Sequence, residues 1–105
     1  MITLSKQAAA VAEILKARQQ TVAVAESSTG GLISANLLAV PGASAYFLGS
    51  AIVYTMRARR ELLDIDKLTL ESQQPLTDAY VTLCAERIRT RLNATWAIEI
   101  GRAHV

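Results

Sequence analysis

The hydrophobic and polar positions of the chain follow helical and extended periods and predict seven elements. Apolar residues recur with helical spacing in four segments. The predicted helices span residues 2–20, 29–39, 57–63 and 77–91. Short apolar runs with β-branched residues indicate buried strands. The predicted strands span residues 21–25 and 48–55, and a third begins at Trp96. Ser5 and Thr77 are the predicted N-caps.

Alternation of helices and strands predicts an α/β fold of three layers, α/β/α, with helices on both faces of the sheet. The second strand is almost continuously apolar, which predicts that it is covered on both faces. Gly49 within it predicts a bulge or a close backbone approach. Residues 43–47 and 64–70 are predicted as turns or loops.

The stretch Ala25–Gly31 predicts a strand, a polar turn with paired glycines, and a helix start. Backbone amides at a helix N-terminus favour an anion, and glycines allow a ligand to approach the backbone. Three interpretations follow. The amides bind a phosphate or nucleotide, a serine acts as a nucleophile beside an oxyanion hole, or the turn is only an N-cap. The turn is neither a Walker loop nor a Rossmann fingerprint.

The residues that would assist such a site are few. The only histidine, His104, is terminal, and no lysine is close in sequence to a strand end, so no base for a serine is evident. Glu26 either accepts hydrogen bonds from ligand hydroxyls or is a structural carboxylate. Tyr54 follows the second strand, and residues 26–31 and 54–59 should converge if the two strands are parallel, because ligands bind beyond the carboxyl ends of such strands.

The length, charge and cysteine content of the chain exclude several classes of function. The chain has 105 residues, which suggests one domain, and 11 basic against 9 acidic residues, which give no electrostatic argument for nucleic acid. Two clusters of arginines are predicted to be solvated helix faces: Arg57, Arg59 and Arg60, and Arg87, Arg89 and Arg91. The single cysteine, Cys84, predicts a buried packing residue and no cysteine-based metal site. No run is long enough for a membrane span, and we expect a cytoplasmic protein.

Several ordered motifs resemble the C-terminal domain of CinA-like, competence-damage inducible proteins, the nicotinamide-nucleotide amidohydrolase family. Ala25–Gly31 is similar to the family run Ala-Glu-Ser-Cys-Thr-Gly-Gly, with Ser28 in place of the cysteine. The other matching segments are Pro41–Ser44, Tyr46–Gly49, Tyr54–Thr55, Leu62–Ile65 and Thr77–Asp78. The resemblance covers about residues 4–98.

The resemblance implies an enzyme of pyridine nucleotide recycling, which hydrolyses the carboxamide of nicotinamide mononucleotide to nicotinic acid mononucleotide and ammonia. It implies serine chemistry with no metal and no cofactor, and a small nucleotide as the partner; a homo-oligomer is left open. The residues that it places at the active site are Ser44, Ser27 and Thr29, with Ser44 and Ser27 as rival nucleophiles. Glu26, Gly30, Gly31, Tyr54 and Arg59 are expected to bind the substrate.

Arg59 departs from the family pattern, because it stands where the family has a lysine. An arginine stays protonated and cannot serve as a base, but it can bind phosphate. The alternative function is therefore a non-catalytic nucleotide-binding member of the same family.

Residues 99–105, Glu-Ile-Gly-Arg-Ala-His-Val, match nothing in the family. They do match the translation of a common sequencing-library adapter. We expect the family domain to occupy residues 1–98 in a partial form, with an incomplete sheet, and residues 99–105 to be a non-native tail. We also expect the present chain to be inactive alone.

Overall fold

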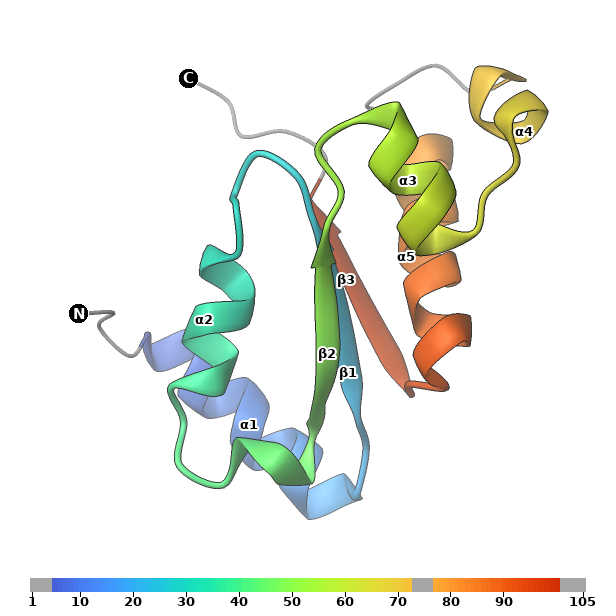
Figure 1. Ribbon diagram of the computed structural model, residues 1–105. Helices are drawn as coiled ribbons and strands as arrows, with labels where there is room; N and C mark the ends of the chain where they lie inside the picture. Colours follow the sequence, from blue (N-terminus) through green and yellow to red (C-terminus); the bar gives the residue numbers. More distant parts are fainter. Residues whose placement is uncertain (1–4, 73–76, 101–105) are drawn as a thin grey trace.

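The computed structural model of the chain describes residues 5–72 and 77–100. It is an α/β fold in which a three-stranded sheet lies between two layers of helices, as the sequence predicted (Figure 1). In chain order the elements are α1 (Lys6–Arg18), β1 (Val22–Glu26), α2 (Leu32–Leu38), the 3-10 helix η1 (Ala43–Ala45), β2 (Phe47–Ile52), α3 (Met56–Leu63), α4 (Lys67–Ser72), α5 (Asp78–Leu92) and β3 (Trp96–Ile100).

The sheet has the order β2-β1-β3, and both pairings are parallel. All five residues of β1 are buried, because this strand has a neighbour on each side and helices on both faces. The bulge predicted at Gly49 is confirmed: Val22 pairs with Phe47, but Ala23 pairs with Gly49. A Cβ on Gly49 would also lie 3.3 Å from Cδ1 of Leu92, so a close approach exists as well.

Helices cover both faces of the sheet, which confirms the three-layer prediction. On one face α1 and α2 form a core with the sheet around Ala12, Val24 and Tyr46. On the other face α3 and α5 form a second core around Leu63 and Cys84. Burial of Cys84 is as predicted.

Two predictions about elements are corrected, and the end of the third strand is now defined. Residues 64–70 include the start of a helix, α4, where Asp66 accepts hydrogen bonds from both the amide and the hydroxyl of Thr69. β2 ends at Ile52 rather than at residue 55, and its residues alternate between half-buried and exposed. β2 lies at the edge of the sheet in the order β2-β1-β3, and its exposed residues show that it is not covered on both faces. β3 continues to Ile100, so Glu99 and Ile100 are part of the sheet.

Helix starts follow the predicted caps. The side chains of Ser5 and Thr77 accept hydrogen bonds from the amides of Ala8 and Tyr80. The part of the predicted first helix before residue 5, residues 73–76 before Thr77, and residues 101–105 with His104 lie outside the described residues.

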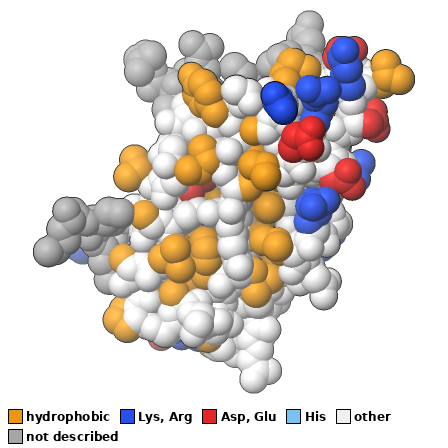
Figure 2. Space-filling view, viewed as in Figure 1, with side chains coloured by type: hydrophobic (Ala, Val, Ile, Leu, Met, Phe, Trp, Pro, Cys, Tyr) orange, Lys and Arg blue, Asp and Glu red, His pale blue; other side chains and the backbone are white. Residues whose placement is uncertain are grey.

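Charged and hydrophobic side chains lie on different parts of the surface. Figure 2 shows that charged side chains gather over α3 and α4, whereas hydrophobic side chains lie over α2 and β2. The large apolar residues exposed there include Leu32, Leu38, Leu48 and Ile52. Within the described ranges, every helix is too short or too polar to cross a bilayer.

Candidate functional site

The carboxyl ends of β1 and β2 meet at one edge of the sheet, at the top of Figure 1. The strands are parallel, and the amide of Val53 donates to the carbonyl of Glu26 over 2.7 Å. The two polar segments that follow these strands, residues 27–31 and 54–59, therefore begin side by side. This confirms the predicted convergence.

Glu26 organises the turn after β1. Its side chain is fully buried, and both carboxylate oxygens accept hydrogen bonds. The donors are the Thr29 hydroxyl, the amides of Gly31, Ile33 and Ser34, and the Ser34 hydroxyl. Burial alone would raise the pKa of Glu26, but hydrogen bonds from Ser34, Thr29 and Ile33 outweigh burial and hold the pKa below its usual value.

The N-terminus of α2 is therefore occupied by the protein's own anion. Each backbone amide from Gly30 to Ser34 has an acceptor within the protein: Glu26 for three of them, and the carbonyls of Ser27 and Thr29 for the other two. The interpretation that these amides bind an external phosphate or oxyanion is corrected, because no hydrogen remains on them to donate. Of the two alternatives for Glu26, the geometry favours the structural carboxylate.

The paired glycines shape the turn. Gly30 has φ +61° and Gly31 has φ +103°, both in the left-handed region. A Cβ on Gly30 would meet nothing within 4 Å, and one on Gly31 would make an ordinary contact with Ile52 at 3.5 Å. These glycines are thus required by backbone conformation. Their expected role in binding a substrate stays a prediction.

Two hydroxyls proposed for catalysis have partners inside the fold. Ser27 is 4% exposed, and its Oγ donates to the carbonyl of Ile100 over 2.8 Å. Thr29 Oγ1 donates to Oε1 of Glu26 over 2.7 Å. Thr29 therefore positions Glu26, and attack by Ser27 would require its hydrogen bond to the end of β3 to break.

Tyr54 and Arg59 both follow the end of β2 but face different surroundings. Tyr54 is 71% exposed and lies at the rim. Arg59 is only 7% exposed, which corrects the prediction that its whole arginine cluster is solvated. Its Nη1 donates to the carbonyl of Tyr54 over 3.3 Å, and its guanidinium carbon lies 5.2 Å from the centre of the Tyr80 ring.

Ser44 lies far from these groups. It is exposed in η1, which precedes β2, whereas the turn follows β1 at the opposite end of the sheet (Figure 1). The five residues of β1 separate the two ends by roughly 13 Å. Within one chain, the structure does not bring Ser44 together with Ser27.

Sequence reasoning missed two polar residues near this end of the sheet. Ser34 is buried and binds Glu26 through both its amide and its hydroxyl. Glu99 is 9% exposed, and neither carboxylate oxygen has a hydrogen-bond partner. A single charge within the apolar run Trp96–Ile100 was the available signal for Glu99.

Burial raises the pKa of Glu99 to about 7, and the positive charge of Arg59 only partly opposes this effect. Glu99 is therefore neutral below neutral pH and charged above it. No metal-binding cluster of acidic, cysteine or histidine side chains occurs in the part of the chain that the structure describes.

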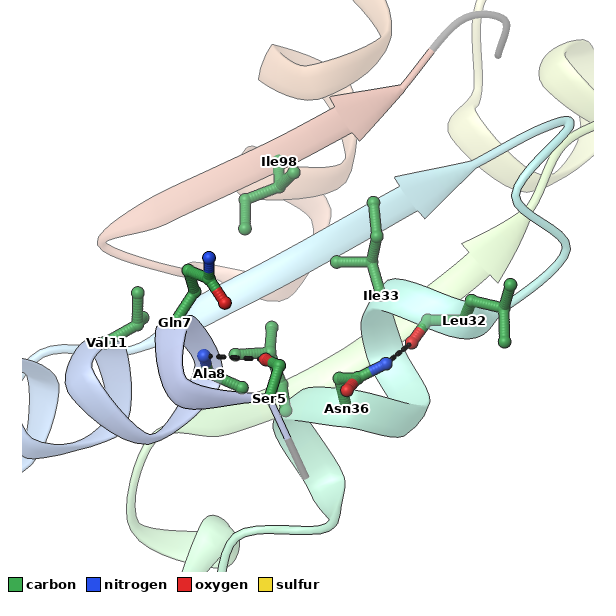
Figure 3. A pocket seen from close by; sticks show the side chains of 9 residues that line it. Ser5, Gln7, Ala8, Val11, Leu32, Ile33, Asn36 and Ile98 are labelled. Atoms are coloured by element: carbon green, nitrogen blue, oxygen red, sulfur yellow. Dashed lines mark hydrogen bonds between the residues drawn. The ribbon is translucent and has the colours of Figure 1, made fainter. Parts of the chain in front are cut away.

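Grooves also border β3 on both faces of the sheet. One, of about 320 Å³, lies between α1, α2 and Ile98 and is lined mainly by apolar side chains (Figure 3). Its polar side chains are already used in part, since Ser5 caps α1 and Asn36 donates to the Leu32 carbonyl.

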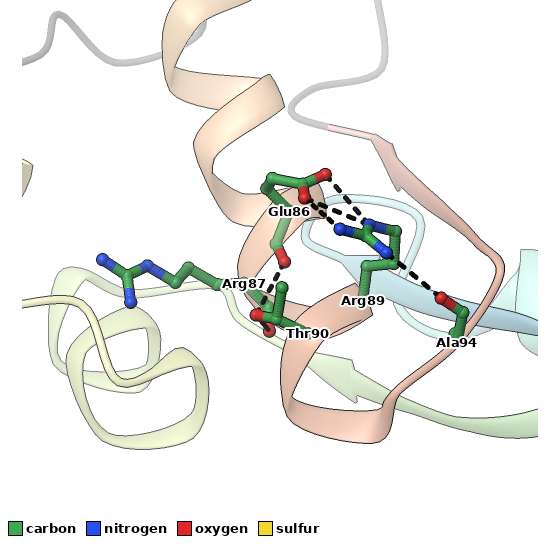
Figure 4. A network of polar contacts seen from close by, with 5 residues as sticks. All are labelled: Glu86, Arg87, Arg89, Thr90 and Ala94. Carbon is green, nitrogen blue, oxygen red and sulfur yellow. Dashed lines mark hydrogen bonds and ion pairs between the residues drawn. The ribbon is translucent and has the colours of Figure 1, made fainter.

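The second groove, of about 580 Å³, lies between α5 and β3. Arg89 on its border binds Glu86 and the carbonyl of Ala94 (Figure 4). This ion pair is exposed, as predicted for the arginines of α5. It stabilises the end of the helix and offers no unpaired cation to a ligand.

Comparison with known proteins identifies the domain. The model of the CinA C-terminal domain matches residues 4–101. A CinA-like protein of Parasynechococcus marenigrum (strain WH8102) is 41% identical over 94 residues, which is 90% of this chain and 22% of that protein. A CinA-like protein of Prochlorococcus marinus (strain MIT 9313) is 42% identical over 94 residues, with the same coverage. The chain thus spans about a fifth of the length of these relatives.

Solved structures show the same fold. The competence damage-inducible protein A of Klebsiella pneumoniae superposes with a TM-score of 0.81 at 29% identity, over 88% of this chain and 57% of that chain. The competence/damage inducible protein CihA of Agrobacterium tumefaciens superposes with a TM-score of 0.80 at 27% identity, over 88% and 56%. With the sequence match, they show that the chain belongs to the CinA C-terminal domain family.

Proposed function

We propose that this domain belongs to a nicotinamide-nucleotide amidohydrolase, which hydrolyses the carboxamide of nicotinamide mononucleotide to nicotinic acid mononucleotide and ammonia. The observation that carries the proposal is the family match over residues 4–101, which includes the turn with Ser27 at the carboxyl edge of the sheet. Ligands of open α/β sheets bind at this edge.

Ser27 is the nucleophile that the geometry favours over Ser44. It directly follows β1 at the edge where Tyr54 and Arg59 also follow β2. In the proposed reaction, Ser27 Oγ attacks the carboxamide carbon, the carbon–nitrogen bond breaks, and ammonia leaves with the serine proton. Water then cleaves the acyl-serine bond and releases the carboxylate product.

The non-catalytic alternative is supported by two observations. The Ser27 hydroxyl is buried and bonded to Ile100, and Arg59 cannot act as a base. In this case the same edge binds a nucleotide without cleaving it, and the exposed Tyr54 is the side chain available to contact the base.

Ammonia release separates the two functions. The longer protein that contains this domain is incubated with nicotinamide mononucleotide, and the 105-residue chain is tested for thermal protection by the same nucleotide. We expect Ser27→Ala to lower kcat about a thousandfold or more while nucleotide protection persists. Ser44→Ala is the matched comparison and should retain activity.

Each outcome decides between the functions. Protection without ammonia release in the unmodified protein would favour the binding function. Full activity of Ser27→Ala would exclude Ser27 as the nucleophile, and loss of activity in Ser44→Ala would show that the active site is not confined to the edge described above. If the nucleotide gives no thermal protection and no ammonia is released, both functions are excluded.

A further inference from the structure

Residues 27–56 carry no charged side chain. Charged residues make up 19% of the chain, yet none of them falls within this segment. The segment nevertheless forms much of the surface in Figure 2, where hydrophobic side chains lie over α2 and β2. A contiguous exposed surface that is apolar and uncharged is typical of a site of contact with another molecule.

The strand β2 forms one part of this uncharged surface. Its residues alternate in exposure, and the exposed ones are Leu48, Ser50 and Ile52. Leu48 is 44% exposed and Ile52 is 51% exposed. Because successive side chains of a strand point to opposite faces, these three side chains share one face of the sheet. The face therefore has a small hydroxyl side chain with an apolar side chain on either side.

The backbone of β2 is also available for pairing. The strand lies at an edge of the sheet that the described residues form. The Val53 amide donates to the Glu26 carbonyl of β1, so the backbone groups of Ser50 and Ile52, which alternate with it, are directed toward the open edge. Natural edge strands are commonly protected by a charge, a proline or a bulge. In β2 the bulge precedes Ser50, and the rest of the strand has no such protection.

The pattern of β2 fits a second copy of the same strand. A twofold axis makes two identical edge strands antiparallel. With this axis at Ser50, Leu48 of each copy lies opposite Ile52 of the other, and the two Ser50 side chains lie opposite each other. Apolar side chains then meet apolar ones. A charged partner would find no complementary charge on this face, whereas a second copy brings no charge that must be buried.

We propose that two copies of this chain associate through β2, so that one continuous antiparallel junction joins their sheets. The start of α2 borders the same face, because a Cβ on Gly31 would lie 3.5 Å from Cδ1 of Ile52. The exposed Leu32 and Leu38 of α2 enlarge the apolar surface beside the junction. This interface lies at the opposite edge of the sheet from β3 and does not depend on the proposed amidase activity.

The antiparallel junction has a geometric consequence that can be measured. It places the start of one β2 beside the end of the other. Ser44, in η1 before β2, then lies near Tyr54 of the other copy, at the rim of the candidate site. This proximity assigns Ser44 no step in the reaction, but it distinguishes antiparallel from parallel pairing.

Thiol cross-linking of the 105-residue chain tests this arrangement. The native Cys84 thiol is buried and burial raises its pKa, so it should stay unreactive. With a bismaleimide of about 8 Å reach, Ser50→Cys should give mainly covalent dimer, because directly opposite side chains are about 5 Å apart at their Cβ atoms. Ser72→Cys, on α4, is the matched control and should give little dimer.

The direction of pairing is tested with two further variants. A mixture of Ser44→Cys and Tyr54→Cys chains should form cross-linked dimers, whereas Ser44→Cys alone should form few. Efficient cross-linking of Ser44→Cys to itself, or a yield at position 72 equal to that at position 50, would overturn the proposal.

Sedimentation velocity tests the energetics of the interface. It is carried out in an Ile14→Glu background, which places a charge beside β3 and so weakens contacts at the other edge. Ser50→Lys should raise the dissociation constant of the dimer at least about tenfold, because it brings two like charges together at the axis. Ser50→Thr and the exposed Ser72→Lys should change this constant less than about twofold.

Urea denaturation of Ser50→Lys provides the folding control, since an exposed edge position should tolerate lysine with little loss of stability. An unchanged dissociation constant in a folded Ser50→Lys would overturn the proposal. A chain that stays monomeric in the Ile14→Glu background would also overturn it, because the β2 face would then belong to a different partner.

Discussion

At the scale of single residues, two buried glutamates behave in opposite ways. Glu26 accepts hydrogen bonds from five donors and has a pKa below its usual value, whereas Glu99 accepts no hydrogen bond and has a pKa of about 7. Burial disfavours both charges, but hydrogen bonds outweigh burial at Glu26, whereas at Glu99 only the charge of Arg59 opposes it, and only in part. Glu26 stabilises the turn, and Glu99 destabilises the end of β3.

Replacing Glu26 should cost much stability. Glu26→Ala leaves the amides of Gly31, Ile33 and Ser34 without their acceptor, and we expect the free energy of unfolding to fall by about 3 kcal/mol. Urea denaturation measures this loss. The exposed Glu13→Gln is the control and should change little.

The Glu26 contribution should also depend on pH. Because the folded state lowers the pKa of Glu26, its contribution is present above the usual carboxyl pKa and is lost as the pH falls through the folded value. Glu26→Gln should remove this part of the acid sensitivity. An unchanged acid unfolding curve in Glu26→Gln would contradict the assignment.

Removing Glu99 should have the opposite effect. The folded state raises the pKa of Glu99, so its penalty is absent below the usual carboxyl pKa and grows as the pH rises to about 7. Glu99→Ala should therefore raise the free energy of unfolding at pH 8 by about 1–3 kcal/mol, and by much less at pH 4. Urea denaturation at the two pH values measures the difference.

At the scale of elements, the turn between β1 and α2 has a specific backbone. Gly30 lies near the left-handed minimum at φ +61°, but Gly31 at φ +103° lies beyond it. Asparagine adopts the first conformation with little strain, whereas no residue with a Cβ adopts the second easily. The two glycines are therefore not equivalent.

This difference predicts the effects of substitution. Gly31→Ala should lower the free energy of unfolding by about 1–2 kcal/mol through backbone strain, because no steric clash is present at this site. Gly30→Asn, the matched variant, should cost less than about 0.5 kcal/mol. Equal losses in the two variants would mean that steric or binding effects, rather than φ, select these glycines.

At the scale of the whole molecule, the sheet formed by residues 5–72 and 77–100 has three strands, with β2 and β3 at its two edges. Grooves lie on both sides of β3: the one between α5 and β3 described above, and an apolar one between α1 and the start of β3. Val11 and Ile14 of α1 in this second groove are 38% and 50% exposed, and Trp96 of β3 is 53% exposed. An exposed edge strand with apolar neighbours tends to pair with another chain.

We therefore expect the 105-residue chain to self-associate as its concentration rises, which sedimentation velocity measures. Ile14→Glu, on α1 beside β3, should weaken association because it places a charge in the apolar groove. Leu68→Glu on α4 is the control, since Leu68 is 79% exposed and lines none of the grooves described beside β3. A chain that stays monomeric at millimolar concentration would contradict the prediction.

The local pattern was sufficient for most elements. Helical and extended periods, together with caps such as Ser5 and Thr77, placed every strand and most helices close to their observed positions, because these signals act within a few residues. The family motifs also identified the turn. The same local signals mistook β2 for a covered strand, because strand order depends on pairing between distant segments.

The tertiary structure alone decided which polar groups have partners. Glu26 binds amides up to eight residues away, Ser27 binds Ile100 across the sheet, and Ser44 lies at the opposite end from both. Glu99 is buried because β3 pairs with β1 and packs under α5, contacts that no periodicity encodes. Sequence thus determined the elements and the family, whereas packing decided the chemical state of each candidate residue, since burial and hydrogen bonding depend on residues far apart in the chain.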